Sequence, residues 1–479
     1  MSPIVVILTI AAYCTVLFTV AWLSSRGMTA EKFFTAGRST PRIVAAIAMV
    51  GAAMSGVTYI SVPGTVAADS FSYLQTTLGF VIGYVVIAYL LIPLYYRLGV
   101  VSLYEYLERR FGESEHRTGA WLFFISKIMS ASLRAYVVCE VLQSLLYDKL
   151  GLPFAINALA MMLFVWLYTR RGGVRAVVWV EMLKSLLMSL SVVMCIIFVI
   201  RALELSSFEA LREIYKSDYT DVLFLDNPLD RRYFFKQVVA GAFLVIAMTG
   251  LDQDMMQTML TCRTQRDAQR GMLSSIAIQS VVILLFLLLG ALLYIFIDSR
   301  GLTIARGDDL FGYVATECGL PTTIGILFLT GLIASTFSSA GSALTALTTS
   351  FSLDILGAKR ENASLRKRVH LAIALAITLL IIAFERWSTS GAITLIFTLA
   401  SYTYGPLLGL FAFGLFTQRM PRRGAVLLMS ALSPTLSYLL ANSSEQLLRG
   451  YTFSYEIIIV NATIMFLGLY ALSRRRATP

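Results

Sequence analysis

The sequence predicts an all-α polytopic membrane protein with about thirteen transmembrane helices, and two observations lead to this fold class. Of the 479 residues, 57% are hydrophobic and only 14% are charged, whereas soluble domains carry about a quarter charged residues. Apolar segments of roughly 20 residues, the length that crosses a bilayer, follow one another along the chain. We therefore expect one integral-membrane domain, residues 1–479, in the cell membrane.

Thirteen apolar segments define the predicted spans. The first has no lysine or arginine before it, unlike a cleaved signal peptide, so we expect a retained helix. The longest connection, 203–232, mixes acidic and basic residues and is expected to be a lid or a solvated loop. The predicted spans are 3–24, 42–67, 73–97, 118–147, 152–170, 174–202, 233–260, 271–298, 321–354, 369–387, 390–417, 421–441 and 452–473.

Basic residues in alternate connections predict the orientation. Of the 39 lysines and arginines, 25 fall in one set of connections and the tail, and ten fall in the opposite set. Cytoplasmic connections carry the excess of basic residues. This places the N-terminus outside and the C-terminus inside, which requires an odd number of spans. The net charge of +11 is thereby explained by topology, and no nucleic-acid partner is expected.

Two of the predicted spans contain residues that weaken a helix. Gly51 to Gly64, GAAMSGVTYISVPG, and Ala247 to Gln257, AMTGLDQDMMQ, each bring glycine and polar residues into an apolar segment. Unwound backbone is tolerated within a membrane where it lines a cavity, and paired broken helices indicate inverted repeats. We predict a first repeat at 42–202 and a second at 233–417, each beginning with a broken helix. The remaining parts are an extra N-terminal helix at 3–24 and two C-terminal helices at 421–473.

A serine cluster, STFSSAGS, lies in the ninth span. Ser335, Ser338, Ser339 and Ser342 have the spacing that places them on one helical face. Hydroxyl oxygens and unwound carbonyls suit an alkali cation. Alternatively, these small residues let helices approach closely and return their hydrogen bonds to the preceding turn.

Several motifs together resemble the sodium/solute symporter family. They are FFTAGRS (Phe33 to Ser39), the broken GAAMSGVTYISVPG, YYRLGVVSLYEYLERRFG (Tyr95 to Gly112), GGVRAVVWVEMLK (Gly172 to Lys184) and YGPLLGLF (Tyr404 to Phe411). The YRLG and YEYLERRF segments are similar to the iodide, multivitamin and monocarboxylate branch. The resemblance implies a LeuT-like fold of two inverted five-helix repeats with broken first helices, and alternating access around a central site.

The resemblance also implies a sodium ion, Na+, between the second and ninth spans. Its ligands are expected to be the carbonyls of Gly51, Met54 and Ser335 and the hydroxyls of Ser338 and Ser339. A second group, Glu181, Lys184 and Ser342, is expected to form either a second ion site or an internal ion pair. Because Lys184 would supply a fixed ammonium there, one sodium per cycle is favoured.

Candidate solute contacts come from the fourth span and from the breaks. Lys127 and Arg134 lie seven residues apart on one face. Arg134 can grip a carboxylate through a bidentate fork, or it can pair internally with Asp252, Asp254 or Glu181. Further candidates for lining or gating the pocket are Ser55, Thr58 and Gln253, and the tyrosines Tyr59, Tyr402 and Tyr404, for which plain packing is the alternative.

These residues predict a sodium-coupled symporter that imports a small, carboxylate-bearing organic solute. A proton-coupled carrier using Glu181 is the alternative. We expect no enzyme, because neither a G-x-S-x-G nor an H-E-x-x-H motif is present. The five cysteines lack metal-type spacing, and His116 and His370 fall at segment ends, where we expect solvated interfacial positions.

Overall fold

The computed structural model describes residues 1–25, 36–99, 102–170, 174–357, 362–387 and 392–475. Parts of three motifs, at 33–35, 100–101 and 172–173, lie outside these residues. So do six of the basic residues used to predict the orientation, namely Arg26, Lys32, Arg171, Lys359, Arg360 and Arg476.

Eight helical segments in the described part are long and apolar enough to cross a membrane. One of them is formed by α5 and α6, which a short π-helical turn joins into a single span. The helices of the eight segments are α1 (Pro3–Ser25), α5 (Tyr73–Val86), α6 (Ile92–Leu98), α8 (Glu113–Leu142), α10 (Val174–Ala202), α14 (Gln265–Ser299), α16 (Thr322–Ser350), α17 (Ala363–Trp387) and α20 (Ala425–Leu447).

Three bent helix pairs raise the number of spans to as many as eleven. The first pair bends by 62°, the second by 70° and the third by 44°. These pairs are α2 (Arg42–Ala53) with α3 (Gly56–Gly64), α12 (Phe234–Val245) with α13 (Gln253–Leu260), and α18 (Ala392–Thr403) with α19 (Gly405–Phe416). Two shorter apolar helices, α9 (Phe154–Thr169) and α21 (Ile457–Ala471), occupy the remaining predicted segments.

The first two breaks occur where the sequence predicts them. In the first, Met54 and Ser55 leave the helix with extended dihedral angles, and Ser55 and Thr58 form a capping box that starts α3. In the second, the Asp252 side chain caps α13 by accepting from the Asp254 N–H at 2.9 Å.

The third bend, between α18 and α19, was not predicted. It lies at Tyr404, directly before Gly405 and Pro406 at the start of α19. The residue before a proline is biased away from helical geometry, so the Gly-Pro pair was the available signal. No charged residue marks this apolar segment.

The remaining elements are short and lie outside the long helices. Within the connection at 203–232, whose role as a lid or solvated loop stays a prediction, α11 is a capped amphipathic helix with Ala210 and Ile214 buried. These elements are α4 (Val66–Asp69), α7 (Glu105–Phe111), α11 (Ser207–Lys216), α15 (Leu310–Thr316) and the antiparallel strands β1 (Arg419–Pro421) and β2 (Ser473–Arg475).

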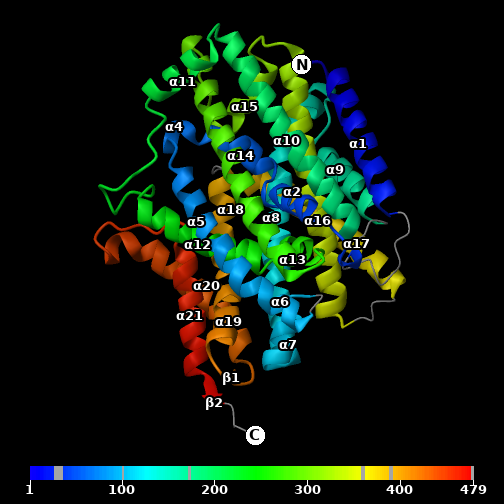
Figure 1. Cartoon of the computed structure of the whole chain (residues 1–479), viewed down its shortest axis with the longest axis vertical. Helices are drawn as coiled ribbons and strands as arrows, with labels where there is room; N and C mark the ends of the chain where they lie inside the picture. The colour runs from blue at the N-terminus through cyan, green and yellow to red at the C-terminus, as the bar shows by residue number, and fades with distance from the viewer. Residues whose placement is uncertain (26–35, 100–101, 171–173, 358–361, 388–391, 476–479) are drawn as a thin grey trace.

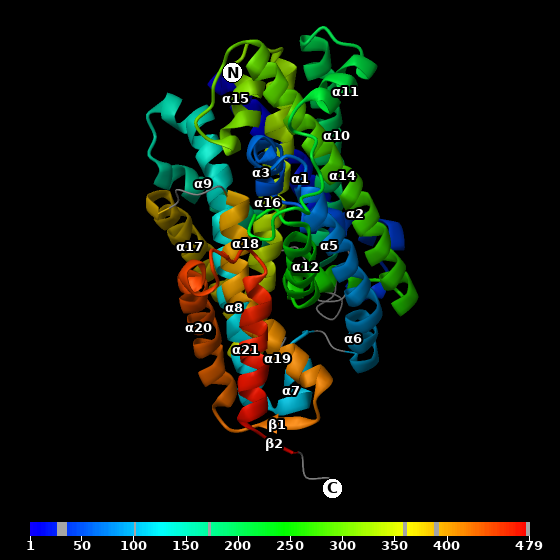
Figure 2. The same ribbon diagram turned by 90° about the vertical axis from the view of Figure 1, so that its left-hand side faces the viewer.

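The broken helices lie in the middle of an elongated molecule. In Figure 1, α1 lies along one flank and α20 and α21 along the opposite flank, with α2, α8 and α13 between them. α11 lies at one end of the long axis, and β1 and β2 lie at the other. Figure 2, turned by 90°, shows α17 and α20 along one edge and α5, α6 and α14 along the other. Elements from distant parts of the sequence therefore surround both breaks.

The two histidines are buried, so the expectation that they are solvated is wrong. The His116 Nε2 atom lies 3.2 Å from an Asp354 carboxylate oxygen. The two ring nitrogens of His370 lie 2.9 Å from the hydroxyls of Thr169 and Thr348. Partners from neighbouring helices satisfy both rings, which removes the need for water.

Candidate functional site

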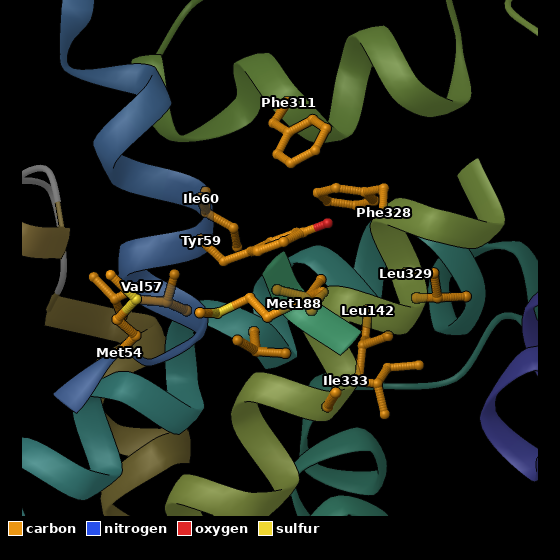
Figure 3. Packing of buried hydrophobic residues seen from close by; sticks show 14 of the residues in the cluster. Met54, Val57, Tyr59, Ile60, Leu142, Met188, Phe311, Phe328, Leu329 and Ile333 are labelled. Atoms are coloured by element: carbon orange, nitrogen blue, oxygen red, sulfur yellow. The ribbon is translucent and has the colours of Figure 1, made fainter. Parts of the chain in front are cut away.

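The first break separates backbone carbonyls from their usual helical donors. The Ser55 N–H donates to the Thr58 hydroxyl at 3.3 Å, and the Thr58 N–H is taken by the Ser55 side chain. Neither donor therefore serves the carbonyl four residues earlier, at Gly51 or at Met54. The Met54 side chain belongs to a cluster of buried hydrophobic residues that also contains Tyr59 and Ile60 (Figure 3). The two carbonyls are thus available to a ligand, as the predicted sodium site requires.

The serines of α16 do not behave alike. Ser335 donates to the Leu332 carbonyl at 2.7 Å, and Ser342 donates to the Ser339 carbonyl at 3.2 Å. These two hydroxyls follow the expected alternative in which serines bond to the preceding turn. The Ser338 hydroxyl is buried and has no hydrogen-bond partner among the described residues.

Ser339 accepts a hydrogen bond from a lysine on another helix. The Lys184 Nζ atom, on α10, lies 2.6 Å from the Ser339 hydroxyl oxygen and 3.1 Å from the Glu181 carboxylate. Both charged side chains are fully buried. The structure thus contains the ion pair that the sequence left as one of two alternatives, and it reaches a predicted sodium ligand.

A second buried charge cluster lies at the second break. The Lys127 Nζ atom, from α8, lies 2.9 Å from Asp252 and 3.0 Å from Asp254. The Tyr404 hydroxyl donates to Asp252 at 3.0 Å. These acids were considered as internal partners for Arg134, but the cation that they contact is Lys127.

Arg134 lies between the two breaks without an ion pair of its own. Within the described part of the chain, no hydrogen bond or salt bridge joins its guanidinium to another residue, and its Nε atom is buried and unsatisfied. The side chain lines two neighbouring cavities. A partly buried guanidinium that lines a cavity is suited to an anion.

The two cavities bring together residues from both breaks and from α16. The first has a volume of about 30 Å³ and the second about 70 Å³. The predicted ion and solute contacts that line the first cavity are Ser55, Arg134, Ser339, Ser342 and Tyr404. Those that line the second cavity are Met54, Ser55, Thr58 and Arg134.

Three predicted solute contacts lie elsewhere. Figure 3 shows the Tyr59 ring facing Phe311 and Phe328, whose centroids are 5.1 and 5.9 Å away, and its hydroxyl contacts Ser191. Gln253 accepts from the Leu103 N–H at 2.8 Å. The Tyr402 ring packs against the ring of Tyr438 on α20, with 6.0 Å between the two ring centroids. None of these three side chains lines either of the two cavities.

Sequence reasoning missed the part played by Lys127. The sequence places Lys127 on the same helical face as Arg134, but it does not predict that Lys127 pairs with Asp252 and Asp254. A lysine in a membrane span must find a partner, and two acids at a predicted break were the available signal. The separation of 125 residues along the chain hid the contact.

The fold and site define a multi-pass membrane transport protein. The family model described as the sodium:solute symporter family matches residues 33–431. This chain belongs to that family and lies in the cell membrane.

Curated relatives and a solved structure agree with this family. The chain is 25% identical to the human sodium/iodide cotransporter over 403 residues, covering 81% of this chain and 61% of the relative. It is 24% identical to sodium-coupled monocarboxylate transporter 1 of Xenopus laevis over 414 residues, covering 83% and 65%. The chain thus spans less than two thirds of the length of either relative.

The structure is similar to a substrate-bound, outward-open Na+-coupled sialic acid symporter. The TM-score is 0.81 at 18% identity, and the match covers 98% of this chain and 99% of that one. This similarity supports the fold.

Proposed function

We propose that this chain is a sodium-coupled secondary active symporter that imports a small, carboxylate-bearing solute by alternating access. The observation that carries the solute class is Arg134, a partly buried arginine with a buried, unsatisfied Nε atom, which lines two cavities and has no acidic partner among the described residues. Burying a lone charge is costly. A solute carboxylate would supply the missing anion.

The charges around the site support an anionic solute. Lys127 is matched by Asp252 and Asp254, and Lys184 is matched by Glu181. Together with Arg134, these side chains carry three positive and three negative charges, so the charge of a bound sodium ion would be balanced by an anionic solute. The iodide and monocarboxylate transported by the two curated relatives are anions as well.

The size of the cavities supports alternating access. Cavities of about 30 and 70 Å³ leave room for only a few water molecules. Binding therefore requires a conformation in which the elements around Arg134 separate. Two broken helices are the elements that such a movement uses in inverted-repeat carriers.

The proposed architecture has thirteen spans, repeats at 42–202 and 233–417, and opposite sides of the membrane for the two termini.

Five oxygens are proposed to bind sodium. They are the carbonyls of Gly51, Met54 and Ser335 and the hydroxyls of Ser338 and Ser339. The unsatisfied Ser338 hydroxyl and the carbonyls released at the first break support this set. A proton-coupled cycle is the second candidate, because the Glu181 Oε1 atom is buried and lacks a partner among the described residues.

The experiment is thermal unfolding of the purified protein in sodium or potassium, with and without a panel of small carboxylates. A ligand that binds only the folded protein raises its melting temperature. We expect sodium to raise the midpoint, the Ser338→Ala/Ser339→Ala variant to lose that rise, and a carboxylate to add a further rise. Stabilisation by low pH and not by sodium, lost in Glu181→Gln, would support the proton-coupled candidate instead.

The matched variants for the solute are Arg134→Gln and Arg134→Lys. Removing a hydrogen bond to a charged group costs about 1.5–3 kcal/mol, so Arg134→Gln should bind the carboxylate about 10- to 100-fold more weakly. Arg134→Lys keeps the charge but lacks the planar guanidinium, so its affinity for the carboxylate should lie between those of wild type and Arg134→Gln. Unchanged carboxylate binding in Arg134→Gln would contradict the proposed role of this residue.

A further inference from the structure

The Lys184 side chain reaches into the proposed sodium site. It comes from α10, is fully buried, and places its ammonium nitrogen 2.6 Å from the Ser339 hydroxyl oxygen. That hydroxyl is one of the five proposed sodium ligands. A positively charged group therefore already occupies one of the ligand positions.

The surrounding helices hold the lysine in this place. Its partner Glu181 lies against the first break, because a Cβ built on Gly51 would be 2.2 Å from the Glu181 carbonyl oxygen and 3.0 Å from its carboxylate. Only a residue without a side chain lets α2 approach α10 so closely. On the other side, Ser339 belongs to α16. The ammonium thus links α10 to α16, and its partner Glu181 packs against α2.

The two cations have overlapping requirements. Sodium binds an oxygen through a lone pair, and the lysine N–H uses a lone pair of the same Ser339 oxygen. Two positive charges that share one ligand also repel each other strongly where little water screens them. Although a hydroxyl oxygen has two lone pairs, this repulsion makes sodium and the ammonium compete for Ser339.

We propose that Lys184 is a built-in competitor for the sodium site, so that sodium binds only when the ammonium leaves Ser339. This inference rests on the proposed function, because it takes the five oxygens as a cation site. The lysine thereby sets the sodium concentration at which the carrier works. Glu181 keeps the displaced ammonium paired, since both are on α10 and their contact does not involve Ser339.

The test is a sodium titration of wild type and Lys184→Gln, read as the shift in melting temperature, with potassium replacing sodium to hold ionic strength constant. Glutamine is similar in length but carries no charge. We expect the half-saturating sodium concentration to fall at least tenfold in Lys184→Gln. The matched control is Lys236→Gln, which removes a buried lysine that contacts backbone carbonyls of Leu229 and Thr452, and it should titrate like wild type.

A second variant covers the case in which Lys184→Gln does not fold because Glu181 is left unpaired. Glu181→Gln/Lys184→Gln removes both charges and frees the Ser339 hydroxyl, and it should also respond at a lower sodium concentration than wild type. An equal or higher half-saturating concentration in the variants that fold, or no sodium response in any protein, would overturn the inference. A wild type that ignores sodium beside a responsive variant would support it.

Solute counterflow in proteoliposomes separates this inference from the proposed function. Counterflow measures exchange of labelled solute and needs no sodium gradient. If wild type shows no counterflow of any carboxylate, the proposed function fails, whatever the titration gives. If counterflow is present and Lys184→Gln does not bind sodium more tightly, only the competition by Lys184 fails.

Discussion

At the scale of single residues, the buried charges near the breaks depend on one another. Lys127 holds two acids of the second break, and Asp252 also accepts from Tyr404 and caps α13. Loss of the lysine would leave two carboxylates in a place with little water. Breaking one side of a buried ion pair costs more than the pair itself contributes.

We predict that Lys127→Met destabilises the protein by about 3–5 kcal/mol. The measurement is the melting temperature in detergent, beside the control Arg306→Gln. Arg306 pairs with Glu140 at 2.8 Å, but the two side chains are 51% and 36% exposed. Its loss should cost about 1 kcal/mol or less. Equal effects of the two variants would show that the Lys127 cluster is not energetically distinct.

At this scale, sequence identified the ionisable residues and offered the Glu181–Lys184 pair as one alternative, but it did not predict the pairings between distant segments. Arg134, Glu181, Lys184 and the acids at Asp252 and Asp254 stood out, because charged residues are rare in apolar segments. Which acid meets which base depends on how α8, α10 and α13 pack, and no local pattern records this. The contact between Lys184 and Ser339 crosses 155 residues of sequence.

At the scale of the helices, glycine determines how closely the broken helix approaches its neighbour. The Gly51 position has no room for a side chain, because Glu181 of α10 occupies the space. Because the packing here is tight, a larger residue at position 51 can be accommodated only if the backbone shifts.

We predict that Gly51→Ala costs about 1–3 kcal/mol of stability through overpacking and weakens sodium binding by moving α2 away from α10. The control is Gly271→Ala in α14, where the nearest atom to an added Cβ is 3.6 Å away. Alanine is the better helix former there, so that variant should be neutral or slightly stabilised. The measurements are melting temperature and sodium titration, and a harmless Gly51→Ala would contradict the close approach.

Helix positions were largely predictable, while the bends were predictable only in part. Long apolar segments gave the elements, and polar residues with glycine marked the breaks at 54–55 and 251–252. The bend at Tyr404 escaped because its signal is one Gly-Pro pair. α11 escaped because its charges suggested solvated coil, although Ser206 and Glu209 form a capping box.

At the scale of the whole molecule, the predicted orientation follows from charge. α11 and the described C-terminal strand β2 lie at opposite ends of the long axis. This is the arrangement expected if the connection at 203–232 is outside and the chain ends inside.

We predict that a membrane-impermeant maleimide labels Ser207→Cys and not Ser114→Cys on intact cells, whereas both react after permeabilisation. Both serines are exposed in the structure, and both substitutions are small. The five native cysteines are buried and should give little background. The reverse labelling pattern would overturn the orientation derived from basic residues.

The ion pair of Glu181 and Lys184 also has an electrical consequence. Both charges are covalently part of the chain, and together they sum to zero, so the pair contributes no net charge movement when the carrier changes conformation. One sodium travelling with one singly charged carboxylate likewise sums to zero. Such a cycle draws no current, and the membrane voltage, which would act on any net transported charge, neither drives nor opposes it. The concentration gradients alone then set how far the solute can accumulate.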